Sequence, residues 1–292
     1  MERLKKQLQT LSELVMFEHT IFSASFIVIA MIVSSNAFYD SGFFGFKTLF
    51  LCAFALITAR NFAMAFNRLC DRDIDSTNER TKNRPSVDGR LSLPALLLFC
   101  VINVVLFVFV SYLINDLAFK LSFPFLFILG VYSVMKRFSC FAHLVLGLSL
   151  GLAPIAGDIA VSGAVHVWTI FLSLGVLFWV AGFDILYSLQ DIEHDKRHNL
   201  YSIPARFGAE NALQIARIFH IFSVFFWALF LRFSTTYHLA IVGLILSACM
   251  LFYEHLIVRK DFCNIPRAFF TTNGYLGFVF LFFIILDSIV RF

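Results

Sequence analysis

Two clusters of acidic residues in this 292-residue chain have the same spacing and predict a site for a cation. The first lies in NRLCDRDID, where Asn67, Asp71 and Asp75 follow one another at intervals of four residues. The second lies in YSLQDIEHD, where Asp191 and Asp195 have the same interval. Positions four apart on an α-helix lie on nearly the same face. Each cluster is therefore expected to present two carboxylates side by side.

Four carboxylates that meet at one site repel one another unless a cation neutralises them. Mg²⁺ suits such a site, because it takes oxygen ligands and is usually held by one or two carboxylates together with substrate phosphates. The sequence therefore predicts that Asp71, Asp75, Asp191 and Asp195 bind Mg²⁺ and a phosphate-bearing ligand.

A calcium-binding EF-hand loop is the competing interpretation of DRDIDS, and it fails. Its sixth position is Ser76 instead of Gly, and its twelfth is Lys82 instead of Glu. The neighbouring acids Asp73 and Glu193 lie off the shared face, and we expect them only to solvate helix ends.

Basic residues close to the acidic clusters could hold a diphosphate. YSVMKRF contains Lys136 and Arg137, and DRDIDSTNERTKNRP contains Arg72, Arg80, Lys82 and Arg84. Charge-assisted hydrogen bonds from such side chains bind phosphate and stabilise it as a leaving group.

The composition places these clusters in an all-α integral membrane protein. Hydrophobic residues make up 60% of the chain and charged residues 14%, and the mean hydropathy is +0.83. A helix needs about 20 apolar residues to cross a bilayer. Nine such runs predict nine transmembrane helices, of which the fourth, with Lys120, is the weakest. They begin near residues 20, 47, 94, 119, 142, 167, 212, 238 and 269.

The distribution of Lys and Arg predicts the orientation. Most of them lie at the N-terminus or after the second, fourth, sixth and eighth runs, so this side is expected to face the cytoplasm and the C-terminus to lie outside. The two acidic clusters are four helices apart on that cytoplasmic side, which indicates a parallel internal repeat. The first twenty residues, with Leu4, Leu8, Leu11 and Val15 on one face, are expected to form an interfacial amphipathic helix instead of a signal peptide.

These motifs resemble those of the UbiA-type aromatic prenyltransferases, which are intramembrane enzymes. NRLCDRDID matches the first family motif, YSLQDIEHD the second, and Tyr132 with Lys136 the Tyr-to-Lys signature after the fourth helix. Arg68 departs from the pattern, because many members have Asp there. The resemblance covers nearly the whole chain and implies a single transmembrane domain over residues 1–292.

The resemblance implies Mg²⁺-dependent transfer of a polyprenyl group from an all-trans polyprenyl diphosphate to an aromatic acid through an allylic cation. Asp71, Asp75, Asp191 and Asp195 would be the catalytic and metal-binding residues, with Asn67 assisting as a ligand. The diphosphate would be bound by Arg72, Tyr132, Lys136 and Arg137. The partners would be the two substrates and the lipid bilayer, with no nucleic acid.

Residues that could bind the acceptor lie deeper in the helices. Arg60 and Asp184 each lie seven residues before a motif residue, and ionisable side chains inside a membrane are functional candidates. Arg60 could hold an acceptor carboxylate or form an ion pair with Asp184. Tyr187 and His19 complete the expected acceptor residues.

The FEHTIF and AMAFNR segments are similar to the branch that prenylates 4-hydroxybenzoate or, in the menaquinone pathway, dihydroxynaphthoate. The expected role is in ubiquinone or menaquinone synthesis. The expected location is the inner membrane of a bacterium, with the active site facing the cytoplasm.

Two other classes of protein stay open from the sequence. An ion-coupled transporter also uses intramembrane acids and internal repeats, but its sites usually lie near the bilayer midplane. A non-catalytic lipid-binding or quinone-binding scaffold would not need the repeated acidic spacing.

Overall fold

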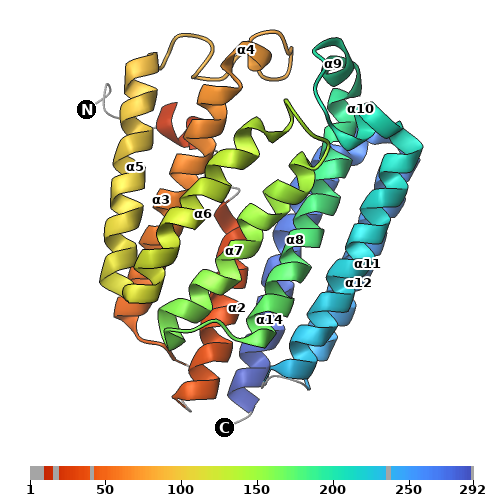
Figure 1. Cartoon of the computed structure of the whole chain (residues 1–292). Coiled ribbons are helices and arrows are strands. Elements are labelled where there is room, and N and C mark those ends of the chain that lie inside the picture. Colours follow the sequence, from red (N-terminus) through yellow and green to blue (C-terminus); the bar gives the residue numbers. More distant parts are fainter. Residues whose placement is uncertain (1–9, 16–19, 40–42, 235–237, 291–292) are drawn as a thin grey trace.

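The computed structural model describes residues 10–15, 20–39, 43–234 and 238–290, and in these ranges the chain is helical without any strand. The long helices run up and down the molecule in one bundle (Figure 1). They are α2 (Thr20–Phe38), α3 (Phe46–Cys70), α5 (Leu93–Ile114), α6 (Asp116–Met135), α7 (Ala142–Ser162), α8 (Val167–Ser188), α11 (Ala209–Phe233), α12 (Ala240–Lys260) and α14 (Asn273–Val290).

Most of these helices begin within a few residues of the positions expected from the apolar runs. Within the described part of the chain, eight helices are long and apolar enough to cross a membrane, including the expected weak one, α6. The apolar part of α2 that the structure describes, Ala24–Phe38, is shorter. An all-helical membrane protein is confirmed, and the count of nine crossings stays a prediction.

Short helices gather at one end of the bundle, where both acidic motifs lie. They are α4 (Arg72–Asp75), η2 (Leu189–Asp191), α9 (Ile192–Arg197) and α10 (Ile203–Phe207). Figure 1 shows α4, α9 and α10 at the same end of the bundle. Before the last long helix, η3 (Phe262–Asn264), α13 (Ile265–Arg267) and a π-helical turn, η4 (Ala268–Thr272), delay the start of α14 beyond the expected residue 269.

Local signals in the sequence set several helix ends. The Ser92 side chain caps α5 by accepting a hydrogen bond from the Ala95 amide. Asn115 separates α5 from α6: its side chain accepts from the Ala118 amide and donates to the Ile159 carbonyl of α7, both at 2.8 Å. The short connection therefore fixes three helices relative to one another.

A cluster of large buried aromatic side chains packs α2, α8, α11 and α14 together. The Phe26 ring lies 5.5 Å from the Trp227 ring in a stacked arrangement and 5.2 Å from the Trp179 ring, and Phe280 packs against Phe26 and Trp227. Such aromatic pairs contribute beyond their buried area. Among the eight helices that are long and apolar enough to cross a membrane, α8 has the largest buried share and α6 the smallest. The bundle thus has an aromatic-packed half, and α6 is the most exposed of these eight helices.

Two glycines let α7 approach the backbone of α8. A Cβ atom on Gly147 would lie 2.2 Å from the Leu177 carbonyl oxygen, and one on Gly151 would lie 2.9 Å from the Ser173 carbonyl oxygen. The two are spaced as G-xxx-G, which is typical of closely packed transmembrane helices. This contact fixes α7 against the helix that carries the second acidic motif.

The predicted amphipathic helix at the N-terminus falls partly outside the described residues, which exclude Leu4 and Leu8. Residues 10–15 are helical, and Leu14 and Val15 are buried in a cluster with Phe62 of α3 and Leu96 of α5. The apolar face of the described segment therefore packs on the bundle. Its interfacial position stays a prediction.

Changing Gly147 to Ala should destabilise the bundle, because the added methyl group meets a backbone carbonyl oxygen that cannot turn aside. Overpacking of this kind costs about 1–3 kcal/mol. Thermal unfolding of the purified protein in detergent should show a fall of several degrees. Gly130→Ala is the matched control, since its Cβ would meet only the Phe66 ring at 3.8 Å. Equal unfolding temperatures for the two variants would contradict this account of the α7–α8 contact.

Candidate active site

One cavity at the end of the bundle collects residues from both acidic motifs. Its volume is about 300 Å³. The residues expected from the sequence that line it are Arg60, Asn67, Asp71, Asp75, Tyr132, Lys136, Asp184, Tyr187, Asp191 and Asp195. Asp71 and Asp75 follow α3 whereas Asp191 and Asp195 follow α8, so the fold brings together acids that are far apart in the sequence.

The spacing predicted that each motif lies on one continuous α-helix. In the structure, each motif instead lies at a break between two helices. Asp71, between α3 and α4, has φ −95° and ψ 7°. Asp191, between η2 and α9, has nearly the same conformation, with φ −105° and ψ 8°. This bridge region of backbone space is sparsely populated and is common for active-site residues. The matching breaks show that the two motifs repeat in local structure as well as in sequence.

Asp71 is the centre of the contacts in the first motif. It is 2% exposed, and its Oδ2 atom lies 2.9 Å from Lys136 Nζ and accepts a hydrogen bond from Asn67 Nδ2 at 3.0 Å. Burial raises the pKa of the Asp71 carboxyl, and the Lys136 ammonium opposes that effect. Its other oxygen, Oδ1, is buried and has no hydrogen-bond partner among the described residues. Such an orphaned oxygen is unusual in a folded protein and is suited to a metal ligand.

Two arginines from the loop after α4 neutralise one acid of each motif. Arg84 donates from Nη1 to both carboxylate oxygens of Asp75 at 2.7 Å. Arg80 lies 2.6 Å from Asp191 Oδ2 and also donates to the Tyr187 hydroxyl at 3.1 Å. Arg80 therefore links the first loop directly to the second motif.

Polar side chains add further contacts between the two loops. Asn78 donates from Nδ2 to Asp191 Oδ1 at 3.2 Å. The Thr77 hydroxyl lies 3.3 Å from His194 Nε2 and 3.1 Å from His198 Nε2. The sequence analysis did not select Asn78 or His194 as site residues, because neither shares the four-residue spacing of the carboxylates. The number of basic residues in the loop did point to Arg80 and Arg84, but not to the acids that they contact.

Arg72 and Arg137 do not line this cavity, although both were expected to bind the diphosphate. They lie with Asp73 in a separate, open depression. Arg137 donates to both carboxylate oxygens of Asp73, at 3.0 and 2.5 Å, and to the Cys70 carbonyl. The Arg137 hydrogen bond holds the pKa of Asp73 below its usual range. Arg137 is therefore placed to stabilise the loop, and neither arginine lines the cavity that holds the motif acids.

The alternative ion pair between Arg60 and Asp184 does not form. Asp184 Oδ2 instead lies 2.7 Å from Nδ1 of His143, a residue that the sequence analysis missed. The Ile203 amide donates to His143 Nε2 at 3.3 Å, so the ring proton is on Nδ1 and is donated to Asp184. Arg60 Nε is buried without a hydrogen-bond partner among the described residues. Arg60 therefore keeps a donor available in the cavity.

His19, the remaining residue expected to bind the acceptor, lies outside the described residues. Tyr187 lies at the cavity wall, where the Arg80 guanidinium carbon is 5.3 Å from the centre of its ring. Its hydroxyl is already used by Arg80. Tyr187 thus contacts the same arginine as the second motif.

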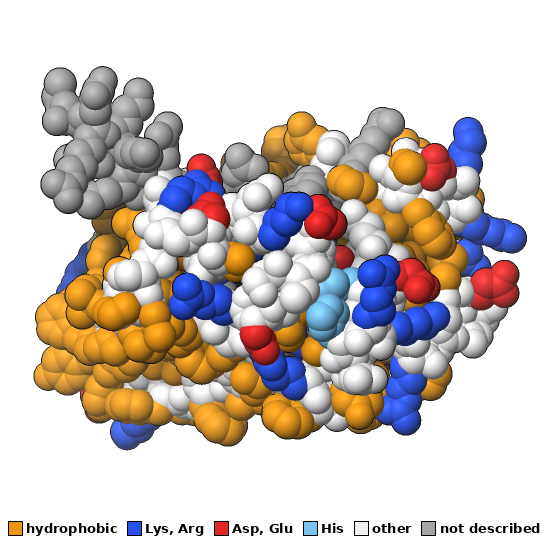
Figure 2. All heavy atoms as spheres, turned by 90° about the horizontal axis from the view of Figure 1, so that it is seen from above, with side chains coloured by type: hydrophobic (Ala, Val, Ile, Leu, Met, Phe, Trp, Pro, Cys, Tyr) orange, Lys and Arg blue, Asp and Glu red, His pale blue; other side chains and the backbone are white. Residues whose placement is uncertain are grey.

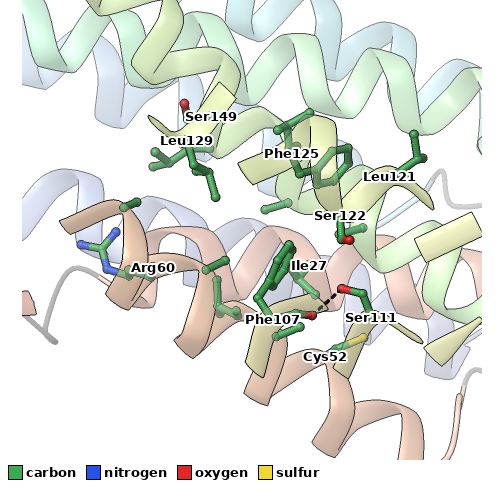
Figure 3. Close-up of a pocket in the computed structure, with 18 of the residues that line it drawn as sticks. Ile27, Cys52, Arg60, Phe107, Ser111, Leu121, Ser122, Phe125, Leu129 and Ser149 are labelled. Carbon is green, nitrogen blue, oxygen red and sulfur yellow. Dashed lines mark hydrogen bonds between the residues drawn. The ribbon is translucent and has the colours of Figure 1, made fainter. Parts of the chain in front are cut away.

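A second, apolar cavity continues from the first into the membrane-spanning part. It has a volume of about 150 Å³ and shares Arg60, Met64, Tyr132, Leu146 and Leu150 with the polar cavity. Figure 3 shows Arg60 toward one end and Cys52 and Ser111 toward the other. Ser111 donates its hydroxyl proton to the Phe107 carbonyl at 2.8 Å, so the hydroxyl is used within its own helix. The lining is therefore suited to a hydrocarbon chain.

The surface above the polar cavity is charged, and the flanks are hydrophobic. Figure 2 shows Lys, Arg, Asp and Glu side chains across the end of the bundle, with His side chains exposed among them. Hydrophobic side chains surround this end face. A water-soluble charged group and an apolar chain can thus reach the joined cavities from different solvents.

The residues that line the cavity are of the chemical type that binds Mg²⁺. In the described part of the chain, however, no three Asp, Glu, His or Cys side chains are already arranged around a common metal position. The two motifs offer four carboxylates and the Asn67 amide to this cavity, all oxygen donors of the type that Mg²⁺ prefers. Asp71 Oδ1 has no partner among the described residues, whereas its Oδ2 pairs with Lys136. Arg84 pairs with Asp75, and Arg80 with Asp191. If the carboxylates held a metal ion, these three cations would be available to bind a phosphate.

Comparisons with known proteins identify the family of this chain. The UbiA prenyltransferase family model matches residues 24–284. The mitochondrial 4-hydroxybenzoate polyprenyltransferase of Schizosaccharomyces pombe is 30% identical over 192 residues, which cover 62% of this chain and 54% of that protein. A 4-hydroxybenzoate octaprenyltransferase of Vesicomyosocius okutanii is 24% identical over 85% of this chain and 90% of its own.

Solved structures share the fold. The apo structure of a UbiA homologue from Aeropyrum pernix K1 has a TM-score of 0.77 at 29% identity, over 94% of this chain and 98% of its own. A UbiA homologue from Archaeoglobus fulgidus bound to DMAPP and Mg²⁺ has a TM-score of 0.71 at 20% identity, over 96% of this chain and 99% of its own. From the family match over most of its length, the chain belongs to the UbiA prenyltransferase family.

Proposed function

We propose that this membrane enzyme transfers a polyprenyl group from an all-trans polyprenyl diphosphate to 4-hydroxybenzoate. The observation that carries the proposal is the junction of two cavities. One is polar, with the four motif carboxylates and several cations, and the other is apolar and begins at Arg60 and Tyr132. A diphosphate fits the first and a prenyl chain the second. The names of the relatives in Schizosaccharomyces pombe and Vesicomyosocius okutanii support the same acceptor.

The diphosphate end of the donor belongs at the carboxylates. Asp71, Asp75, Asp191 and Asp195, with Asn67, would hold Mg²⁺, which supplies the positive charge that neutralises the leaving diphosphate. The solved homologue from Archaeoglobus fulgidus bound to GPP and Mg²⁺ supports this choice of metal.

The basic residues of the cavity bind the leaving group. Lys136, Arg80 and Arg84 line the cavity and replace Arg72 and Arg137 as the diphosphate ligands. Their charge stabilises the diphosphate as the carbon–oxygen bond breaks and the leaving oxygen takes the electron pair. Tyr132 lies where the polar cavity meets the apolar one, next to the allylic carbon in this arrangement.

Arg60 and Asp184 act on the acceptor. Arg60 has a free buried donor and would bind the acceptor carboxylate, which places the aromatic ring between the two cavities. A ring carbon attacks the allylic cation and forms the new carbon–carbon bond. The proton that leaves the same ring carbon passes to Asp184, whose carboxylate is oriented by the Nδ1 proton of His143.

Dihydroxynaphthoate is the alternative acceptor, and it would use the same residues. Both molecules carry a carboxylate for Arg60 and an electron-rich ring, and the larger naphthalene ring would extend further along the apolar wall. Ubiquinone and menaquinone synthesis are the corresponding pathways. Assays that offer each acid with the same prenyl diphosphate distinguish them.

The charged end of the bundle faces the cytoplasm of a bacterium in this proposal, because Lys and Arg concentrate there. Water-soluble acceptors and the released diphosphate then exchange with the cytoplasm. The prenyl donor enters from the membrane.

Replacing Asp71 or Asp191 by Asn should lower turnover by roughly 100-fold or more, because the shape is kept and the charge that binds the metal is lost. Prenylation of 4-hydroxybenzoate in isolated membranes, with and without a chelator, measures the effect. Asp73→Asn is the matched control, because Asp73 contacts Arg137 outside the cavity, and it should keep near wild-type activity. Chelator-resistant activity at wild-type level in both variants would rule out the metal-diphosphate mechanism.

Replacing Arg60 by Gln should raise the KM for the aromatic acid by roughly 10- to 100-fold, the range expected for loss of one charge-assisted hydrogen bond. The KM for the prenyl diphosphate should change little. Steady-state kinetics with each substrate varied in turn provides the test. Arg137→Gln serves as the control, because Arg137 binds Asp73 and is remote from the acceptor. An equal rise in both KM values would show that Arg60 does not act on the acceptor alone.

Replacing Asp184 by Asn should lower kcat with little effect on the KM for the prenyl diphosphate, because the amide cannot accept the ring proton. Removal of that proton should then limit the rate. An acceptor deuterated at the attacked carbon should consequently react more slowly than the unlabelled acid in the variant. An unchanged kcat, or no isotope effect in a slowed variant, would show that another group takes the proton.

A further inference from the structure

A third cavity lies between α11 and α12, and the proposed reaction makes no use of it. Its volume is about 740 Å³, and its lining includes Arg217, His220, Phe225, His255 and Arg259. None of its lining residues is shared with the polar or the apolar cavity of the active site. The wall is otherwise apolar, so the cavity opens on the part of the bundle that faces lipid.

Two buried histidines form a directed chain of hydrogen bonds in this cavity. His220 Nε2 lies 3.3 Å from the Trp179 carbonyl oxygen, which can only accept, so that nitrogen carries the proton. His220 Nδ1 is then an acceptor, and it lies 2.9 Å from His255 Nε2, which must be the donor. In neutral rings this chain leaves His255 Nδ1 as an acceptor. The backbone carbonyl thus fixes the tautomers of both side chains.

His255 Nδ1 has no partner among the described residues. The side chain is 8% exposed, and the atom itself is buried. Buried polar atoms in folded proteins nearly always have a hydrogen-bond partner. The His255 ring lines the cavity, so an occupant that displaces the side chains covering Nδ1 would supply the missing donor. The occupant should therefore present a hydroxyl or N–H group.

Two arginines add positive charge to the same cavity. Arg259 lies in the last turn of α12, and Arg217 lies in the first half of α11, which begins beside α10. Both are thus toward the end of the bundle that carries the acidic motifs (Figure 1). No hydrogen bond or ion pair to either arginine occurs within the described part of the chain. An anion at this level of the bundle would be bound by both.

We propose that this cavity binds an anionic phospholipid whose headgroup carries free hydroxyl groups, of the phosphatidylglycerol type. The phosphate contacts Arg217 and Arg259, and a headgroup hydroxyl donates to His255 Nδ1. An acyl chain lies along the apolar wall between α11 and α12, past Phe225. Basic pockets between transmembrane helices on the cytoplasmic side are a recognised type of anionic-lipid site.

The hydroxyl requirement separates this site from general attraction of anionic lipids. Phosphatidylmethanol carries the same single negative charge on its phosphate diester but no headgroup hydroxyl, so it can satisfy the arginines but not the His255 acceptor. Phosphatidylcholine satisfies neither, because its net charge is zero and its headgroup has no hydroxyl. The predicted order of affinity is phosphatidylglycerol, phosphatidylmethanol, then phosphatidylcholine.

Native mass spectrometry of the detergent-purified full chain, titrated with each of the three lipids, tests the proposal. Arg217→Gln combined with Arg259→Gln should weaken phosphatidylglycerol binding by roughly tenfold or more. His255→Phe keeps a ring of similar shape and should abolish the preference for phosphatidylglycerol over phosphatidylmethanol. Lys260→Gln, which removes a neighbouring positive charge outside the cavity, is the matched control and should bind as the wild type does.

Several outcomes would overturn the proposal. The first is equal affinity for all three lipids, and the second is an equal loss of binding in the double variant and in Lys260→Gln. The third is that a prenylated aromatic acid displaces phosphatidylglycerol at a concentration below that of the lipid. The last result would make the cavity a product site. Prenyl transfer measured on the same samples checks that the variants are folded. It also keeps this test separate from the proposed reaction, because the variants leave the carboxylate cavity unchanged.

Discussion

Repulsion among four carboxylates is the constraint on which the end of the bundle depends. Asp71, Asp75 and Asp191 each have a basic partner, and these partners come from two different segments: Lys136 follows α6, while Arg84 and Arg80 belong to the loop after α4. The loops are therefore held in place by the same charges that would bind substrate. A ligand that draws the cations away from the acids must also rearrange the loops, so binding and loop order are coupled.

The helices beneath this charged end position the acids through apolar packing. Phe26, Trp179, Trp227 and Phe280 pack α2, α8, α11 and α14 together, and Gly147 and Gly151 bring α7 against α8. As a result, His143 on α7 lies within hydrogen-bond distance of Asp184 on α8. The chemistry that we assign to Asp184 therefore rests on a helix contact that involves no charge.

The sequence predicted much of the fold because its dominant signals are local. Apolar runs gave most helix starts within a few residues, and the repeated acidic spacing identified acids that line one cavity. The partners of those acids could not be predicted, because they depend on how loops fold. Arg137 and Arg80 are equally basic in the sequence, yet only Arg80 contacts a motif acid. His143 was missed for the same reason, since nothing near it in the sequence points to Asp184.

The small apolar cavity has a consequence for the specificity of the enzyme. At about 150 Å³ it is below the usual range for pockets that enclose a whole ligand, so it can surround only the part of an isoprenoid nearest the reacting carbon. In the proposed reaction, the remaining units of a long donor would lie outside this cavity in the hydrocarbon of the bilayer, where one more unit meets the same environment as the last. An enzyme with this arrangement does not discriminate between prenyl donors of different length. The tail of the product is then set by whichever synthase supplies the diphosphate.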